Sequence, residues 1–330
     1  MGRLDEVKPN VVTPYLTDKI WLFYGEMATR KTSVACSFPG HVLFAFDIGY
    51  KLINGAMAVP MQTWADFKNT VRELDKKSNK ERFSTVIIDT IGMAYQACYQ
   101  YMLTQMGIND PGEIKFGMAW RRIRDEFETV VRSIVQKGYG LVMLAHSDEV
   151  ESEDKDTKKK IVTTKVDIDK RPGLIIKGLA DFALFLKKEP RDGTDDIPTV
   201  YAYSDLVTID TKRRSRYFSP RFEFTYDNLQ YELQNAVQRQ YSAEGTQMPE
   251  TFEIINPYAR PDISFSELRA SVIGMAQTLI DKGMENEVNE VLLNVFKGIR
   301  LSEVEETQEN INRLQVIHET LADLVSKAMV

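Results

Sequence analysis

Residues 25–32 read GEMATRKT and differ at one position from the phosphate-binding pattern G-x-x-x-x-G-K-[ST]. In such a loop, backbone N–H groups and the start of the next helix surround the phosphates. The lysine neutralises the β and γ charges, and the threonine hydroxyl holds Mg²⁺. The pattern therefore predicts a site for ATP and Mg²⁺, with Lys31 and Thr32 in those roles. The residues expected around the ligand are Gly25, Ala28, Thr29, Arg30, Lys31, Thr32, Ser33 and Asp89.

Arg30 stands where the pattern has its second glycine. A side chain at this position costs conformational freedom and room for close backbone approach, but it removes no N–H donor. If φ is negative there, Arg30 is tolerated, with its side chain directed outwards or towards a phosphate of the same or a neighbouring subunit. The alternative is a chance match in an ordinary loop between a strand and a helix.

Asp89 ends the apolar run VIID, so we expect it at the C-terminal edge of a strand that neighbours the loop. A carboxylate that orients Mg²⁺ belongs at that edge, which makes Asp89 and Thr32 the predicted metal-binding pair. The alternative is a helix cap, a role that Thr90 could also fill.

Two more polar residues lie at the ends of predicted strands. Asp47 comes after FAF and could polarise the water that attacks the γ-phosphate, which makes it the predicted catalytic carboxylate, in a catalytic set with Lys31 and His146. His146 comes after MLA and could sense the γ-phosphate and signal to the charged segment behind it. The alternatives are a turn aspartate that bonds its own backbone and a satisfied histidine at a strand end.

Short apolar runs alternate with longer amphipathic ones in the first half of the chain, which predicts an α/β fold with a mainly parallel sheet. The predicted strands are 19–24, 41–47, 84–90 and 140–147, and the predicted helices are 33–38, 63–77 and 117–137. The run at 84–90 is unbroken, as in a strand buried on both faces. This order places each candidate residue at the end of a strand or the start of a helix.

The pattern changes after residue 148. Residues 149–160 are charged and look like a mobile loop or hairpin tip, and strands resume at 181–187 and 199–212. Turn residues without periodicity predict a linker at 239–262. We therefore divide the chain into an ATPase core at 1–238 and a small helical C-terminal domain at 263–330, with helix starts at Ser264 and Ser302.

Composition indicates a globular intracellular protein. The 330 residues include two cysteines and three histidines, too few for a disulfide framework or a zinc-type spacing. The N-terminus lacks the apolar core of a signal peptide, and no run is apolar enough to span a membrane. The expected location is the cytoplasm. The net charge of −6 argues against a uniformly basic nucleic-acid surface.

The order of these motifs resembles the RecA-like ATPase core, and over roughly residues 12–238 it is similar to the phage-encoded, single-strand annealing recombinases of the Sak-four type. The resemblance implies an oligomeric, nucleotide-dependent protein in the bacterial host cell that binds single-stranded DNA, with a single-strand binding protein as partner. By the same resemblance, Asp47 corresponds to the catalytic carboxylate, which is generally a glutamate in RecA-like proteins. The shorter side chain makes nucleotide binding a safer expectation than fast hydrolysis.

Two basic segments are candidates for DNA contact, because cations supply the phosphate term and aromatic rings can stack on bases. The second could instead supply a trans-acting arginine finger, and both could be ordinary surface charge. The cations concerned are Lys158, Lys159 and Lys160 in the first segment and Lys212, Arg213, Arg214 and Arg216 in the second.

Two other functions fit the same motifs. A helicase or helicase loader would use the same core and would unwind strands or bind a replicative helicase. A nucleotide-gated interaction protein would bind ATP tightly with negligible turnover, and Arg30 and Asp47 would then mark a decayed site.

Overall fold

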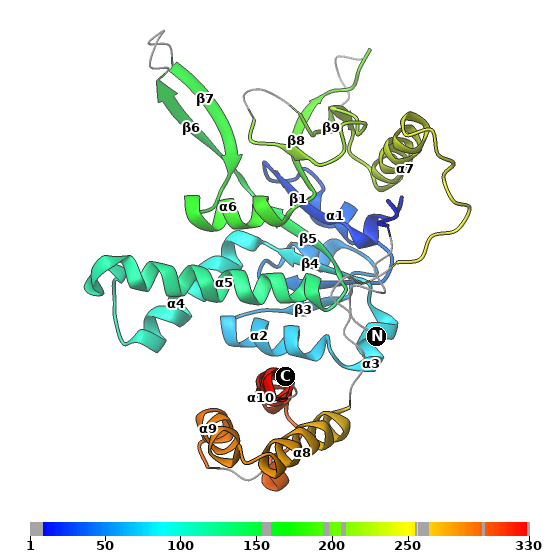
Figure 1. Ribbon diagram of the computed structural model, residues 1–330. Coiled ribbons are helices and arrows are strands. Elements are labelled where there is room, and N and C mark those ends of the chain that lie inside the picture. The colour runs from blue at the N-terminus through cyan, green and yellow to red at the C-terminus, as the bar shows by residue number, and fades with distance from the viewer. Residues whose placement is uncertain are drawn as a thin grey trace. The chain divides into compact units, whose positions relative to one another are not determined.

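The computed structural model describes residues 9–153, 160–193, 198–205, 209–254, 256, 264–298 and 301–328 of the chain (Figure 1). Backbone contacts divide it into two compact units, Met1–Ala259 and Arg260–Val330. The first unit is a sheet with helices on both faces, and the second is helical.

The sheet of the first unit has the strand order β11-β9-β8-β1-β5-β4-β2-β3, with β10 against β8. Six neighbouring strands, from β8 to β3 in that order, run parallel, and β9, β10 and β11 are antiparallel to their neighbours. This confirms the predicted α/β class with a mainly parallel sheet. The strands are β1 Ile20–Gly25, β2 His41–Ala45, β3 Ala58–Pro60, β4 Thr85–Asp89, β5 Gly140–Ala145, β8 Phe182–Pro190, β9 Pro198–Tyr203, β10 Lys212–Arg213 and β11 Arg221–Glu223.

Helices cover the sheet on both faces because the central strands are buried on both sides. One apolar core joins the sheet to α2 Trp64–Glu73, α4 Ile91–Met106, α5 Met118–Gln136 and α6 Lys170–Leu179. The core on the opposite face includes α1 Lys31–Ala35 and α7 Tyr226–Ala243. The remaining helical segments of this unit are α3 Lys77–Arg82 and the short 3₁₀ turns η2 Leu16–Asp18, η3 Gly49–Leu52, η4 Pro111–Glu113 and η5 Lys115–Gly117.

Local sequence explains where the predicted helices begin and which face they bury. Thr63 and Asp66 form a reciprocal capping box at the start of α2, in agreement with the predicted N-cap. In α5, every third or fourth residue is buried, as the apolar spacing predicts. Helices α4 and α6 were not predicted.

The charged segment after β5 forms an antiparallel hairpin of β6 Ser147–Glu153 and β7 Lys160–Val166 (Figure 1). Of the segment predicted as a loop or hairpin tip, residues 149–153 and 160 belong to the two paired strands, which agrees with the hairpin alternative, and residues 154–159 lie outside the described residues. Lys158 and Lys159 lie outside the described residues, and Lys160 begins β7. The strand predicted at 199–212 was too long, since β9 ends at Tyr203.

The segment predicted as a linker, 239–262, is partly structured. Helix α7 continues to Ala243. Beyond it, the ring of Phe252 contacts Tyr15 edge-on, with 5.9 Å between centroids. The side-chain amide of Asn256 donates to the carbonyl oxygen of Gln136 at 3.3 Å. Phe252 and Asn256 therefore contact other parts of the first unit, which composition alone did not reveal.

The second unit contains α8 Phe265–Asp281, α9 Glu285–Phe296, the 3₁₀ turn η6 Leu301–Glu303 and α10 Gln308–Ala328 around an apolar core of its own. Ser264 and Glu267 form the predicted capping box of α8. The helix start predicted at Ser302 is wrong, because Thr307 accepts a bond from the Asn310 N–H at the start of α10. Across the described residues of both units, no helix combines the length and apolarity needed to cross a membrane.

Candidate active site

The phosphate-loop sequence connects β1 to α1. Strand β1 ends at Gly25 and α1 begins at Lys31. Leu186 of β8 lies directly opposite Gly25, and a Cβ on Gly25 would stand 2.2 Å from the Leu186 carbonyl oxygen. Only glycine lets the two backbones approach this closely, so Gly25 is required by the packing of β1 against β8.

Arg30 has φ 60° and ψ 20°, in the left-handed region. The negative φ at which Arg30 would be tolerated is therefore not found, because this residue occupies a conformation that glycine adopts freely. Ala28, two residues earlier, also has a positive φ of 59°. Each such residue costs about 1–2 kcal/mol, and strain of this kind persists where the surrounding structure imposes it, often at functional sites.

The Lys31 side chain folds back onto the loop and is only 8% exposed. Its Nζ donates to the carbonyl oxygens of Gly25 at 2.9 Å and Glu26 at 2.7 Å, and to Thr29 Oγ1 at 3.1 Å. Burial lowers the pKa of Lys31 to about 8, opposed by the charges of Asp89 and Glu26. The ammonium group is thus held by loop oxygens that phosphate oxygens could replace.

Thr32 and Asp89 are in direct contact, since Thr32 Oγ1 donates to Asp89 Oδ2 at 2.8 Å. Asp89 is 5% exposed, and burial raises its pKa, opposed by this hydrogen bond. Mg²⁺ usually binds through one or two carboxylates together with waters and substrate phosphates, so this hydroxyl and carboxylate fit that ion. The alternative role, capping the next helix, belongs to Thr90, whose Oγ1 accepts from the Met93 N–H at 3.4 Å.

Asp47 and His146 follow the strands on either side of β4. The Asp47 N–H donates to the Asp89 carbonyl oxygen at 3.0 Å, which holds the loop after β2 against the end of β4. Both side chains act on the Asp89 carboxyl, whose pKa Asp47 raises and His146 lowers. Asp47 Oδ1 also accepts from the Ile48 N–H at 2.6 Å, the local bond expected of a turn aspartate.

Ser33 is exposed on the first turn of α1, next to Thr32. Together, Lys31, Thr32, Asp89, Asp47 and His146 gather at one edge of the parallel sheet, because β1, β2, β4 and β5 all end there. A group at this edge can bind a phosphate chain, a divalent cation and an attacking water.

Lys188 of β8 is a cation near the loop that the sequence interpretation missed. Its charge lowers the pKa of Lys31, after the larger effects of burial and the two carboxylates. The available signal was the pair of lysines that ends the apolar run FALFL. These lysines can be related to the loop only once β8 is known to pair with β1.

The cations at 212–216 are engaged differently from one another. Lys212 Nζ donates to two carbonyl oxygens at the end of α6, at 2.8 Å and 3.0 Å. Arg213 donates to the Phe218 carbonyl oxygen at 2.6 Å, and Arg214 pairs with Asp181 at 3.0 Å. Arg216 is exposed and lies over the Tyr217 ring, 4.9 Å from its centroid. The first two therefore support the fold, and Arg216 offers the freest cation of the segment.

An exposed aromatic residue on the turn between α4 and α5 was also missed. Phe116 is 96% exposed and has a positive φ of 61°. Lys115, Arg121 and Arg122 beside it in sequence are exposed, and none has an acidic partner among the described residues. The sequence signal was KFG followed closely by the basic pair RR.

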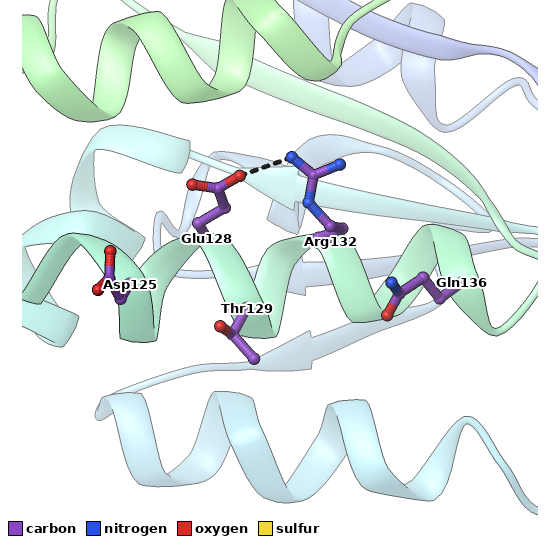
Figure 2. A pocket seen from close by; sticks show the side chains of 5 residues that line it. All are labelled: Asp125, Glu128, Thr129, Arg132 and Gln136. Atoms are coloured by element: carbon purple, nitrogen blue, oxygen red, sulfur yellow. Dashed lines mark hydrogen bonds and ion pairs between the residues drawn. The ribbon is translucent and has the colours of Figure 1, made fainter. Parts of the chain in front are cut away.

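A hollow of about 300 Å³ lies along α5, away from these residues. Figure 2 shows its five lining side chains, all on one helix, with Glu128 paired to Arg132 at 2.6 Å. Because it contains none of the loop or strand-end residues, it is not part of the candidate active site.

Comparison with known proteins agrees with this geometry. The family model described as AAA domain matches residues 17–224, a span that includes β1, the loop and every strand of the sheet. The chain is also similar to the SPbeta prophage-derived uncharacterized protein YorG of Bacillus subtilis (strain 168), with 26% identity over an alignment of 330 positions that covers 96% of this chain and 97% of the relative. Since the family model covers well over half of the chain, this protein belongs to the AAA domain family of P-loop ATPases.

Proposed function

We propose that this protein is an Mg²⁺-dependent ATPase that uses nucleotide binding to control annealing of single-stranded DNA in phage recombination or replication, in the cytoplasm of the bacterial host. The observation that carries the ATPase part is the contact of Thr32 with the buried Asp89 beside Lys31. The DNA part is supported by the resemblance of the motifs to annealing recombinases and by the prophage origin named for the similar B. subtilis protein.

Each residue has a defined task in this proposal. Lys31 exchanges its loop oxygens for the β- and γ-phosphates, and Thr32 and Asp89 hold Mg²⁺, which neutralises charge that develops on the phosphate oxygens. Asp47 accepts the proton of the attacking water after it releases the Ile48 N–H. His146 donates to the γ-phosphate and relates its presence to the hairpin that begins at Ser147.

The α4–α5 turn is the proposed DNA contact. Helix α4 starts directly after Asp89–Thr90 and has 16 residues, so it leads from the metal-binding pair to the turn over about 24 Å. At the far end, Phe116 can stack on an unpaired base, and Lys115, Arg121 and Arg122 can contact phosphates. We assign the trans or DNA contact of the second basic segment to Arg214 and Arg216, in a homo-oligomer that works with a single-strand binding protein.

The test of the ATPase is steady-state hydrolysis with Mg²⁺, with and without single-stranded DNA, for wild type, Lys31→Ala and Asp47→Asn. We expect turnover that DNA stimulates and that both substitutions abolish. DNA binding is then compared for Phe116→Ala and for Tyr231→Ala, a control on α7 that removes another exposed aromatic ring. Loss of one stacking contact should weaken binding about tenfold for Phe116→Ala only. Equal affinities would refute the assigned contact.

A second function, a nucleotide-gated interaction protein, is favoured by one observation: the Asp47 carboxylate already accepts the backbone N–H of Ile48. If the wild type binds ATP but hydrolyses it no faster than Asp47→Asn, with or without DNA, this second function replaces the first.

A further inference from the structure

Lys188 stands at the same edge of the sheet as the phosphate loop, although 157 positions separate it from Lys31 in sequence. Strand β8 pairs in parallel with β1, and Leu186 lies opposite Gly25, the first residue of the loop. Lys188 is two residues further along β8, which places it about 7 Å beyond Gly25 in the strand direction. This is the level at which the chain leaves β1 and turns towards α1.

The alternation along β8 places Lys188 on the face of the sheet that α1 covers. Leu184 and Leu186 belong to the apolar core that includes α1, whereas Phe185 belongs to the core on the opposite face. Residues two apart in a strand share a face, so Lys188 continues the row of Leu184 and Leu186. The loop must cross this face to reach Lys31, and Lys188 therefore flanks it.

The neighbouring Lys187 differs from Lys188 in the face of the sheet on which it lies and in the pairing of its side chain. It lies on the opposite face and pairs with Glu189 at 3.1 Å. Lys188 is exposed, and no hydrogen bond or ion pair engages its side chain within the described part of the chain. Its ammonium group instead acts on Lys31, a like charge. Lys31 and Lys188 repel each other, and a polyanion such as a phosphate chain bound at the loop would stabilise both charges.

We infer that Lys188 is a second phosphate-binding cation, which reaches across the loop from β8 to the phosphate chain of the nucleotide that Lys31 holds. The ligand class is a nucleoside triphosphate with its Mg²⁺, bound within one subunit. The inference rests on the nucleotide binding of the proposed function and not on its DNA activity. Lys188 is a positioning residue for the phosphates, since Thr32, Asp89 and Asp47 retain the metal and water roles.

The test is equilibrium binding of ATP in the presence of Mg²⁺ and without DNA, for the full-length wild type, Lys188→Gln and Lys187→Gln. We expect Lys188→Gln to weaken ATP binding about tenfold, the effect of about 1.4 kcal/mol for one lost charge-assisted contact. Lys187→Gln, which removes the same charge one residue away, should change it less than twofold. Because Lys188 is exposed, thermal unfolding without nucleotide should be the same for both variants.

Affinity for ATP within twofold of wild type in Lys188→Gln, or equal losses in both variants, would overturn the inference. Lys188→Arg, which restores the positive charge, should recover most of the affinity, and failure to recover it would equally count against a phosphate contact. The proposed function fails separately. If Lys188→Gln weakens ATP binding but the wild type does not anneal DNA, only the recombinase function is refuted. If the wild type anneals DNA in an ATP-dependent manner and Lys188→Gln does not change ATP affinity, only this inference is refuted.

Discussion

Replacing Arg30 by glycine is expected to stabilise the nucleotide-free protein. Arg30 has a left-handed backbone, which costs a residue with a side chain about 1–2 kcal/mol. Glycine removes that cost but loses more conformational freedom on folding, by about 0.4–1 kcal/mol. The difference is a gain of about 0–1.6 kcal/mol, with a central value of about 0.8 kcal/mol. For a unit of this size it corresponds to a rise of about 2 °C in the unfolding midpoint.

Met27→Gly is the matched control. Met27 belongs to the same loop and is 75% exposed, but it is not among the residues with positive φ. Glycine there relieves no strain and retains the entropic cost, so the midpoint should fall by about 1–2 °C. Arg30→Ala keeps the left-handed backbone and removes the guanidinium, so it separates the side chain's own contribution from that of the backbone.

Thermal unfolding followed by circular dichroism, without nucleotide and at one ionic strength, measures all three variants. The reasoning predicts opposite signs for two glycine substitutions three residues apart. If Arg30→Gly lowers the midpoint as much as Met27→Gly does, Arg30 is not strained in the loop. If Arg30→Ala alone reproduces the gain, the guanidinium and not the backbone is responsible.

Three further predictions concern the loop and its metal-binding pair. The pKa of Lys31, lowered to about 8 mainly by burial, should rise on contact with phosphate, so ATP binding should take up protons at about pH 8–9 and weaken as pH rises through that range. Calorimetry in buffers of different ionisation enthalpy measures this uptake, and an undiminished uptake in Lys31→Arg would assign the proton to another group. Thr32→Val removes the hydrogen-bond donor to the buried Asp89, so it should lower the free energy of unfolding in urea by about 1–3 kcal/mol and abolish Mg²⁺-dependent hydrolysis. Thr32→Ser keeps the hydroxyl and should therefore keep both the stability and the hydrolysis. Equal damage by the two substitutions would contradict the role of the hydroxyl. Gly25→Ala should destabilise the protein by about 1–3 kcal/mol or more, because the added Cβ meets the backbone of β8. Gly178→Ala on α6, where an added Cβ meets nothing within 4 Å, should stabilise it by about 0.5–1 kcal/mol. Urea unfolding measures both changes, and an unchanged free energy of unfolding in Gly25→Ala would contradict the close packing of β1 and β8.

The part of the fold that the sequence predicted depends on local patterns. The unbroken run Val86, Ile87 and Ile88 indicated a strand buried on both faces, and it forms β4. The period of α5 and the cap at Thr63 were equally readable because a helix face and a cap involve residues a few positions apart. Helix α4 was missed because apolar and small residues occur on all of its faces. Its buried residues Ala94, Cys98 and Met102 therefore do not stand out in the sequence as one apolar stripe.

The rest depends on contacts between distant segments. The positive φ of Arg30 follows from the path between β1 and α1 and has no signature in the residue type. Lys188 gains its place from the pairing of β8 with β1. The match at Ser302 fitted a capping box, but the chain starts its helix at Gln308, where Thr307 provides the cap. Cap motifs therefore predicted the helix starts at Thr63 and Ser264 but not the one at Ser302, and the place of Lys188 could be found only from the pairing of distant strands.

The hairpin of β6 and β7 has a mechanical consequence. Its arms leave the sheet next to His146, and Asp167 at the other arm's base donates its N–H to the His146 carbonyl oxygen at 2.9 Å. Seven paired residues make an arm about 23 Å long from this base to the pair of Glu153 and Lys160. A rotation of about 10° at the base displaces that pair by about 4 Å. The length of the hairpin would therefore enlarge a small rotation at its base, beside the candidate active site.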